Sequence, residues 1–157
     1  MPDDVRPPPP SADALARYDE DGALWAVQQA ALIRAGRWDV LDAGNIAEEI
    51  EALSRSEFRA LVGALRVALL HMLKWDHQPE RRGTSWAKSI RNGRADAREC
   101  LAENPSFRRR LPEAVALAYG RAREDAADET GLPPRTFPET CPYTTEDIFD
   151  RPYRFEG

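Results

Sequence analysis

The chain reads Val-Ala-Leu-Leu-His-Met-Leu-Lys-Trp over residues 67–75, and as a helix this stretch is apolar nearly all round. A helix without a wide polar face is usually buried at the centre of a bundle. Apolar residues at helical spacing extend the pattern on one stripe, which comprises Ile46, Ile50, Leu53, Leu61, Leu65, Ala68, Leu69 and Met72. The stretch therefore predicts a central helix against which the other helices pack.

The central pattern begins at Asp42 or Asn45 and ends before Pro79, because the residue before a proline disfavours helix. A capping-box pattern at Ser54 leaves open a break that would divide it into two helices. The apolar stripe stays in register across this point. We therefore expect one long helix over residues 45–78.

Capping residues and prolines divide the rest of the chain into further helices. Asp19 is the expected N-cap of the first helix, with Ser11 or Asp13 as alternatives, and Gly36 is its expected C-terminal cap. The remaining boundaries are expected at Thr84 or Ser85, Asn104-Pro105, Leu111-Pro112, Gly131 and Thr144. The sequence thus predicts an all-α fold, a helical bundle of four to six helices around the central apolar helix.

Length and composition point to one globular domain. The chain has 157 residues, of which 42% are hydrophobic and 31% charged. We expect a disordered, proline-rich tail over residues 1–12 and a single helical domain over residues 13–157. No apolar run approaches the roughly 20 residues that span a bilayer, and the N-terminus has no apolar signal region. We expect a cytoplasmic protein with no membrane contact.

Several strings of residues match a known pattern along most of the chain. They are Tyr18-Asp19-Glu20-Asp21, Asn45-Ile46-Ala47-Glu48-Glu49-Ile50-Glu51, His71-Met72-Leu73-Lys74-Trp75, Ser85-Trp86, Glu129-Thr130-Gly131-Leu132 and Cys141-Pro142-Tyr143. Together they resemble a bacterial helical family catalogued as domain of unknown function 29. The resemblance implies an all-helical fold and a bacterial setting, and it brings no activity with it.

Three polar residues interrupt the central apolar helix. His71, Lys74 and Gln78 lie within about 60° of one another around the helix axis. Such a strip could hold a ligand or transfer a proton, with His71 as the base and Lys74 as its electrostatic partner. The alternative is a core histidine with satisfied hydrogen bonds and a lysine that extends to solvent near the helix end. We favour the alternative and keep the three as candidates for catalysis.

Metal binding is a weaker hypothesis, and we expect no cofactor. Carboxylates on helices hold metals in di-iron bundles, and the candidates here are Glu48, Glu49 and His71. On one continuous helix Glu49 and His71 would lie about 33 Å apart, too far to share an ion within one chain. The two cysteines, Cys100 and Cys141, form no Cys-x-x-Cys pair. The acidic residues are more simply explained as helix-start carboxylates facing solvent.

A basic segment lies between two acidic ones. Residues 80–111 carry nine basic and four acidic side chains, whereas residues 11–60 and 112–157 each carry five and ten. The candidate binding residues in the basic segment are Trp86, Lys88, Arg91, Arg94 and Arg98. They could contact phosphates and stack a base. The net charge of −5 and the pI near 5.2 argue against a dedicated nucleic-acid binder.

No complete catalytic set appears in the sequence, and four tryptophans are many for this length. Tryptophan is enriched at protein interfaces. The sequence favours a non-enzymatic helical interaction module that assembles with itself or with a protein partner. The alternative is nucleic-acid or anion binding through residues 81–110, and the third hypothesis is a metal- or His-dependent enzyme.

Overall fold

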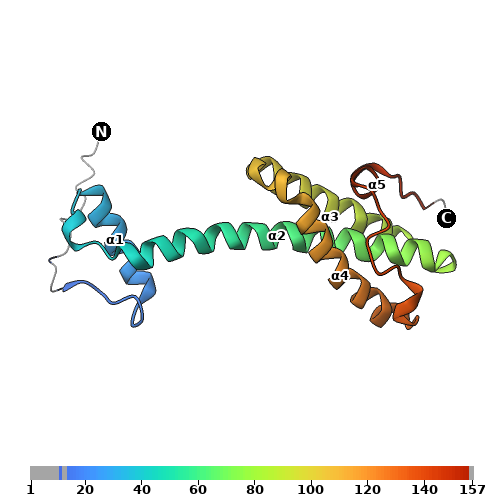
Figure 1. Cartoon of the computed structure of the whole chain (residues 1–157), viewed down its shortest axis with the longest axis horizontal. Helices are drawn as coiled ribbons and strands as arrows, with labels where there is room; N and C mark the ends of the chain where they lie inside the picture. Colours follow the sequence, from blue (N-terminus) through green and yellow to red (C-terminus); the bar gives the residue numbers. More distant parts are fainter. Residues whose placement is uncertain (1–10, 12–13, 156–157) are drawn as a thin grey trace. The chain divides into compact units, whose positions relative to one another are not determined.

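The computed structural model describes residue 11 and residues 14–155, which form five α-helices and no strand (Figure 1). The helices are α1 (Gly22–Arg34), α2 (Ala43–His77), α3 (Thr84–Glu103), α4 (Leu111–Thr130) and α5 (Thr145–Asp150). Short 3-10 turns at Trp38–Val40, Pro79–Arg81, Pro105–Arg110 and Pro134–Thr136 join them. The predicted all-α fold with four to six helices is confirmed. Apart from Ser11, the predicted tail over residues 1–12 lies outside the described residues.

The contacts divide the chain into two compact units, with the boundary between Leu53 and Ser54 inside α2. The first unit holds α1 and the beginning of α2. The second unit holds the rest of α2 together with α3, α4 and α5. That residues 13–157 fold as a single domain stays a prediction.

Helix α2 is continuous, so the expectation of one helix rather than two is confirmed. Asp42, one of the two predicted starting residues, precedes it. Its carboxylate accepts hydrogen bonds from the backbone N–H of Asn45 at 3.3 Å and from the Asn45 side-chain amide at 2.7 Å. These bonds hold the pKa of Asp42 below its usual value, and the bond from the Asn45 side chain has the largest effect. A charged cap of this kind satisfies backbone donors that the first helical turn leaves free.

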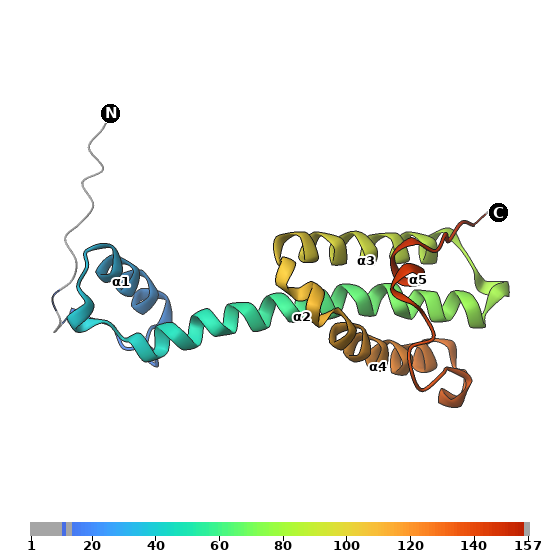
Figure 2. The same ribbon diagram turned by 45° about the horizontal axis from the view of Figure 1, so that its top comes forward.

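The core of the second unit forms around α2, which packs with α3 and α4 as a bundle (Figure 1, Figure 2). The most deeply buried α2 side chains are Leu61, Leu65, Leu69, Met72 and Leu73. The predicted central apolar helix is therefore confirmed for this unit. Among the described helices, none combines the length and the apolar composition that a membrane crossing requires.

The boundaries predicted at Asn104-Pro105 and Leu111-Pro112 are confirmed. Three further predicted boundaries are confirmed, and the chemistry of each is local. Gly36 and Gly131 end α1 and α4 in left-handed conformations, with φ of +68° and +70°. Glycine adopts such angles without strain from a side chain. The Thr144 hydroxyl accepts a hydrogen bond from the Asp147 backbone N–H, and the Asp147 carboxylate accepts one from the Thr144 backbone N–H. This reciprocal capping box begins α5.

Two predicted N-caps are wrong. Asp21, not Asp19, caps α1 and accepts a hydrogen bond from the Leu24 backbone N–H at 2.9 Å. Asp19 is instead paired with Arg17 at 3.0 Å. Helix α3 has Gly83 at its N-cap, and Thr84 is the first helical residue.

Candidate functional site

Both histidines of the second unit are bound to their own helix. His71 Nδ1 lies 2.9 Å from the Val67 carbonyl oxygen, and His77 Nδ1 lies 2.9 Å from the Leu73 carbonyl oxygen. Because a carbonyl can only accept, Nδ1 carries the hydrogen in each ring. The His77 ring also packs at 4.8 Å from the ring of Phe137. The His71 ring, a candidate base, is thus oriented by the backbone one turn earlier in α2.

Lys74 and Gln78, the other two members of the predicted polar strip, connect α2 to the end of α4. Lys74 Nζ donates to the Glu129 carboxylate at 2.6 Å and lies 4.8 Å from the centroid of the Trp86 ring. Buried Gln78 donates to the Thr130 carbonyl at 3.5 Å. The three strip residues therefore have separate partners, and those of Lys74 and Gln78 lie in other helices.

The two glutamates of the metal hypothesis belong to the first unit, and His71 belongs to the second. Glu49 accepts a hydrogen bond from the Tyr18 hydroxyl at 2.5 Å, and this bond raises the pKa of Tyr18. Glu48 is exposed. Within residues 11 and 14–155, no group of three or more His, Cys, Asp or Glu side chains could hold a metal ion. Glu49 thus ties the segment before α1 to α2.

Arg94 of α3, one of the candidate phosphate-binding residues, is buried and only 9% exposed. Its guanidinium donates to the carbonyl oxygens of Asp147 at 2.8 Å, Ile148 at 2.5 Å and Arg151 at 2.7 Å. Burial lowers the pKa of Arg94. The donors of this candidate binding residue are thus used within the chain. Its spacing of four residues from Ile90, which is also buried, was the signal in the sequence that Arg94 lies on a covered side of α3.

The other basic residues of α3 divide into two kinds. Arg98 donates to the Phe149 carbonyl at 2.7 Å and to the Asp150 carboxylate at 2.8 Å. Lys88 and Arg91 are exposed, and neither makes an ion pair or hydrogen bond to another described residue. Phosphate binding by the candidate residues stays a prediction, and in this structure Arg94 and Arg98 use their donors to hold the chain around α5.

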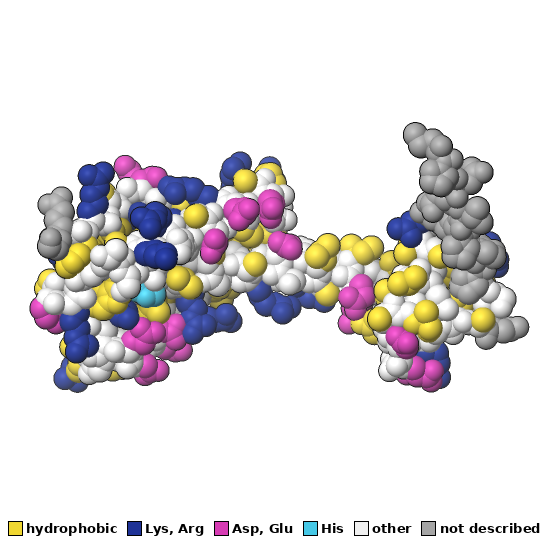
Figure 3. Space-filling view, turned by 180° about the vertical axis from the view of Figure 1, so that it is seen from behind, with side chains coloured by type: hydrophobic (Ala, Val, Ile, Leu, Met, Phe, Trp, Pro, Cys, Tyr) yellow, Lys and Arg dark blue, Asp and Glu magenta, His cyan; other side chains and the backbone are white. Residues whose placement is uncertain are grey.

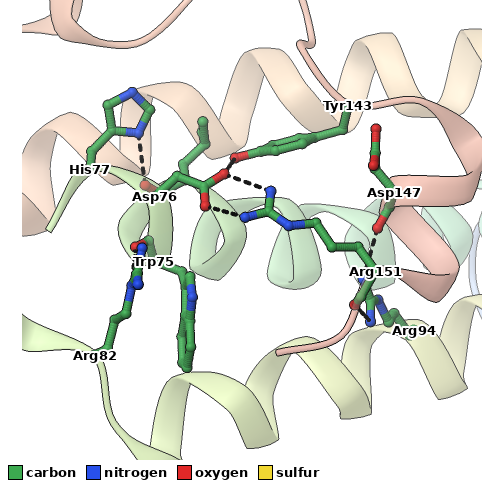
Figure 4. Close-up of polar contacts among 9 residues, drawn as sticks. Trp75, Asp76, His77, Arg82, Arg94, Tyr143, Asp147 and Arg151 are labelled. Carbon is green, nitrogen blue, oxygen red and sulfur yellow. Dashed lines mark hydrogen bonds and ion pairs between the residues drawn. The ribbon is translucent and has the colours of Figure 1, made fainter. Parts of the chain in front are cut away.

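Sequence reasoning missed a cluster around Asp76, near the end of α2 (Figure 4). The Asp76 carboxylate accepts two hydrogen bonds from the Arg151 guanidinium, at 2.6 and 2.9 Å, and one from the Tyr143 hydroxyl at 2.9 Å. Burial, with Asp76 beside it, raises the pKa of Tyr143. The partners follow Asp76 by 67 and 75 residues, so no local spacing could reveal them.

Tyr153 completes this cluster. Its ring meets the Trp75 ring edge to face at a centroid distance of 5.6 Å. Its hydroxyl is buried and has no hydrogen-bond partner among the residues described. Burial raises the pKa of Tyr153 to about 12. Together with Arg94, the cluster fastens the segment after α4 onto α2 and α3. These contacts give the cluster a structural role.

The first unit is held by polar contacts on one side of α1. The Trp25 indole N–H donates to the Asp42 carboxylate at 3.1 Å, and the Gln29 side-chain oxygen accepts from the Asp42 backbone N–H at 2.9 Å. Trp25, Gln29 and Leu32 are the buried residues of α1. No residue of α2 before Phe58 is buried. The apolar core of this unit is therefore small.

Large apolar side chains are exposed on the rest of the first unit (Figure 3). This first-unit apolar surface comprises Leu24, Val27, Ile33, Trp38, Ile50 and Leu53. Of the nine large hydrophobic residues that are exposed in the described part of the chain, six lie here, although this unit is the smaller of the two. The stripe expected in the core is wrong at Ile50 and Leu53, which are 65% and 64% exposed. They are exposed because the buried side of α1, which holds Trp25 and Leu32, covers neither of them.

A family model described as Domain of unknown function DUF29 matches residues 17–154. The matched range includes all five described helices and most of each unit. No curated protein and no solved structure matches the chain.

Proposed function

The chain belongs to the DUF29 family, and we propose that it is a non-enzymatic helical interaction module that pairs with a second copy of itself through the first-unit apolar surface. The observation that carries the proposal is the apolar character of α1 on both of its sides. Trp25 and Leu32 are buried, whereas Leu24 and Val27 are 48% and 69% exposed. A helix that is apolar all round is normally buried, so α1 is expected to lie beneath a partner.

The beginning of α2 extends the same surface. Ile46, Ile50 and Leu53 follow the i, i+4, i+7 spacing that places side chains on one helical face. One first unit therefore supplies two helices with uncovered apolar residues. Two copies would supply four, the number that encloses a bundle core, and a symmetric pair would use the same surface on each partner.

The area available favours reversible pairing. Full burial of a Val, Leu or Ile side chain contributes about 1.5–3 kcal/mol, and these side chains are already partly covered, so each adds about 1–2 kcal/mol. Association costs at least about 4 kcal/mol in lost freedom of motion. A symmetric pair would cover five such side chains on each partner, and their summed gain exceeds this cost, so pairing is expected to rise with protein concentration.

The contacts in the second unit support a structural role for the polar strip on α2. His71 binds its own helix, Lys74 pairs with Glu129, and Gln78 donates to the end of α4. Each of these bonds holds a helix in place. This use of the candidate catalytic groups supports the non-enzymatic part of the proposal.

Light scattering on a size-exclusion column tests the pairing. The mass of the full chain is expected to rise towards twice the monomer mass as concentration increases from micromolar to millimolar. Leu24→Glu should hold the chain monomeric, because a carboxylate would be buried without a partner. Leu117→Glu is the matched control, since Leu117 is also a helical leucine that is 48% exposed but lies in the second unit.

Two results would contradict the proposal. The first is a wild-type chain that stays monomeric at the highest concentration. The second is an equal loss of pairing in both variants, which would mean that added charge, rather than the first-unit surface, disrupts the pair.

A further inference from the structure

Two adjoining hollows lie between α3 and the chain after α5, both within the second unit. Their volumes are about 320 and 370 Å³. Ala87 and Arg91 of α3 line both hollows, as do Tyr153 and Arg154 from the opposite side. Each volume is in the range of about 300–1,000 Å³ typical of small-molecule pockets.

Three positive charges without a partner border these hollows. Lys88 and Arg91 are one turn apart on α3, and Arg154 lies across from them. All three are exposed, and none makes an ion pair or hydrogen bond within the described part of the chain. No described acidic side chain lines either hollow. An anion placed here would meet uncompensated charge, and guanidinium groups bind phosphate through paired hydrogen bonds.

The wall opposite α3 is fixed rather than loose. Arg94 donates to three backbone carbonyls around α5, and Arg151 is bound to Asp76 through two hydrogen bonds. The guanidinium carbons of Arg94 and Arg151 also lie 5.1 and 4.8 Å from the centroid of the Tyr153 ring. The chain leading to Arg154 is thereby anchored on buried contacts, which pre-organises the cations across the hollows.

An aromatic side chain stands beside the cations. Phe155 lines the second hollow and is 47% exposed. Bases stack on aromatic side chains with about 1–3 kcal/mol each. Cations and an exposed ring in one place match a ligand that joins a phosphate to a planar group.

We propose that these hollows bind a nucleotide phosphate, with Lys88, Arg91 and Arg154 on the phosphate and Phe155 against the base. A free mononucleotide and one nucleotide of a single strand offer this same chemistry. The site keeps two residues of the basic segment predicted from sequence, replaces Arg94 and Arg98 by Arg154, and is independent of pairing by the first unit.

Calorimetry on the full chain with adenosine 5′-monophosphate and with inorganic phosphate measures the free ligands. Fluorescence anisotropy with a short labelled single-stranded RNA measures the strand. The nucleotide should bind more tightly than phosphate. The double substitution Arg91→Gln and Arg154→Gln should weaken binding about tenfold or more, because charge-assisted bonds to phosphate are lost. Phe155→Ala should weaken nucleotide binding and leave phosphate binding unchanged.

Arg109→Gln is the matched control. Arg109 is exposed, has no partner among the described residues and belongs to the same basic segment, but it lines neither hollow. If the mononucleotide binds, and this binding is weakened in the double variant but retained in the control, the ligand is a free nucleotide and the proposal is supported. If only the RNA shows this pattern, the proposal is supported and the ligand is a nucleotide of a single strand.

The absence of binding by both probes at low salt would overturn the proposal. So would an equal loss in the control, because the attraction would then come from the charge of the whole segment. If the double variant fails to fold, Phe155→Ala decides, and unchanged nucleotide affinity in that variant overturns the site.

Discussion

Replacing Gly93 by alanine is expected to destabilise the second unit, although alanine is the better helix former. Gly93 lies in the middle of α3 where this helix meets α2. A Cβ atom there would lie 2.8 Å from the Ala64 carbonyl oxygen and 2.9 Å from the Ala68 backbone nitrogen. Both are backbone atoms of α2, so no side-chain rotation can relieve the contact. The two helices would have to move apart.

The magnitude follows from two opposing terms. Alanine in place of glycine stabilises a helix by about 1 kcal/mol. Overpacking a core costs about 1–3 kcal/mol, and the upper end applies because backbone must shift. Separation of the helices also weakens the contacts of Ile90 and Ala97, which are 1% and 0% exposed. We expect a net loss of about 1–2 kcal/mol in the free energy of unfolding.

Gly63→Ala is the control for this prediction. Gly63 is an exposed residue of α2, and a Cβ atom there would have nothing within 4 Å. The same substitution should therefore stabilise by about 0.5–1 kcal/mol. Urea unfolding followed by circular dichroism measures both. A Gly93→Ala chain as stable as wild type, or both variants stabilised alike, would refute the close contact between the helices.

Three further substitutions or conditions test the buried contacts. Arg94→Met should lower the free energy of unfolding in urea by about 3 kcal/mol, because three carbonyl oxygens lose a charged donor. It should also speed backbone hydrogen exchange around α5, and unchanged exchange would contradict this prediction. Asp76→Asn should cost about 1–3 kcal/mol, because it weakens the partly buried ion pair with Arg151. Asp96→Asn, at an exposed site, should be neutral in the same assay. Burial raises the pKa values of Tyr119 and Tyr153 to about 12, so between pH 10 and 12 only the unfolded state loses these protons, and the free energy of unfolding should fall as pH rises through this window. Urea unfolding at each pH measures this fall, and tyrosinate absorbance reports the ionisation. A free energy of unfolding that does not change with pH would count against the burial of these hydroxyls.

Much of the helical framework could be predicted because its signals are local. Gly36 and Gly131 end helices through their own backbone angles, and Thr144 finds its capping partner three residues away. The prediction was wrong for Asp19, because Asp21 caps α1 two residues later, and at Thr84, which lies inside the helix rather than before it. Where two nearby groups compete, the pattern alone does not decide the outcome.

The candidate sites were less predictable because their partners are distant in sequence. The sequence shows that the segment 81–110 is rich in basic residues, but it could not show that Arg94 is covered by the chain around Ile148. The cluster of Asp76 with Arg151 gave no local sign, since it joins residues 75 positions apart. Distant contacts of this kind require the fold itself.

Spacing along the chain is enough to predict that the chain is helical, where most helices end, and that residues 67–75 belong to the central helix of the bundle, because these properties depend on periodicity within one helix. Which side of each helix is covered depends instead on packing between elements that are distant in sequence. Ile50 and Leu69 belong to the same stripe of α2, yet the first is 65% exposed and the second is fully buried. Periodicity creates an apolar face, but burial of that face depends on whether another element packs against it.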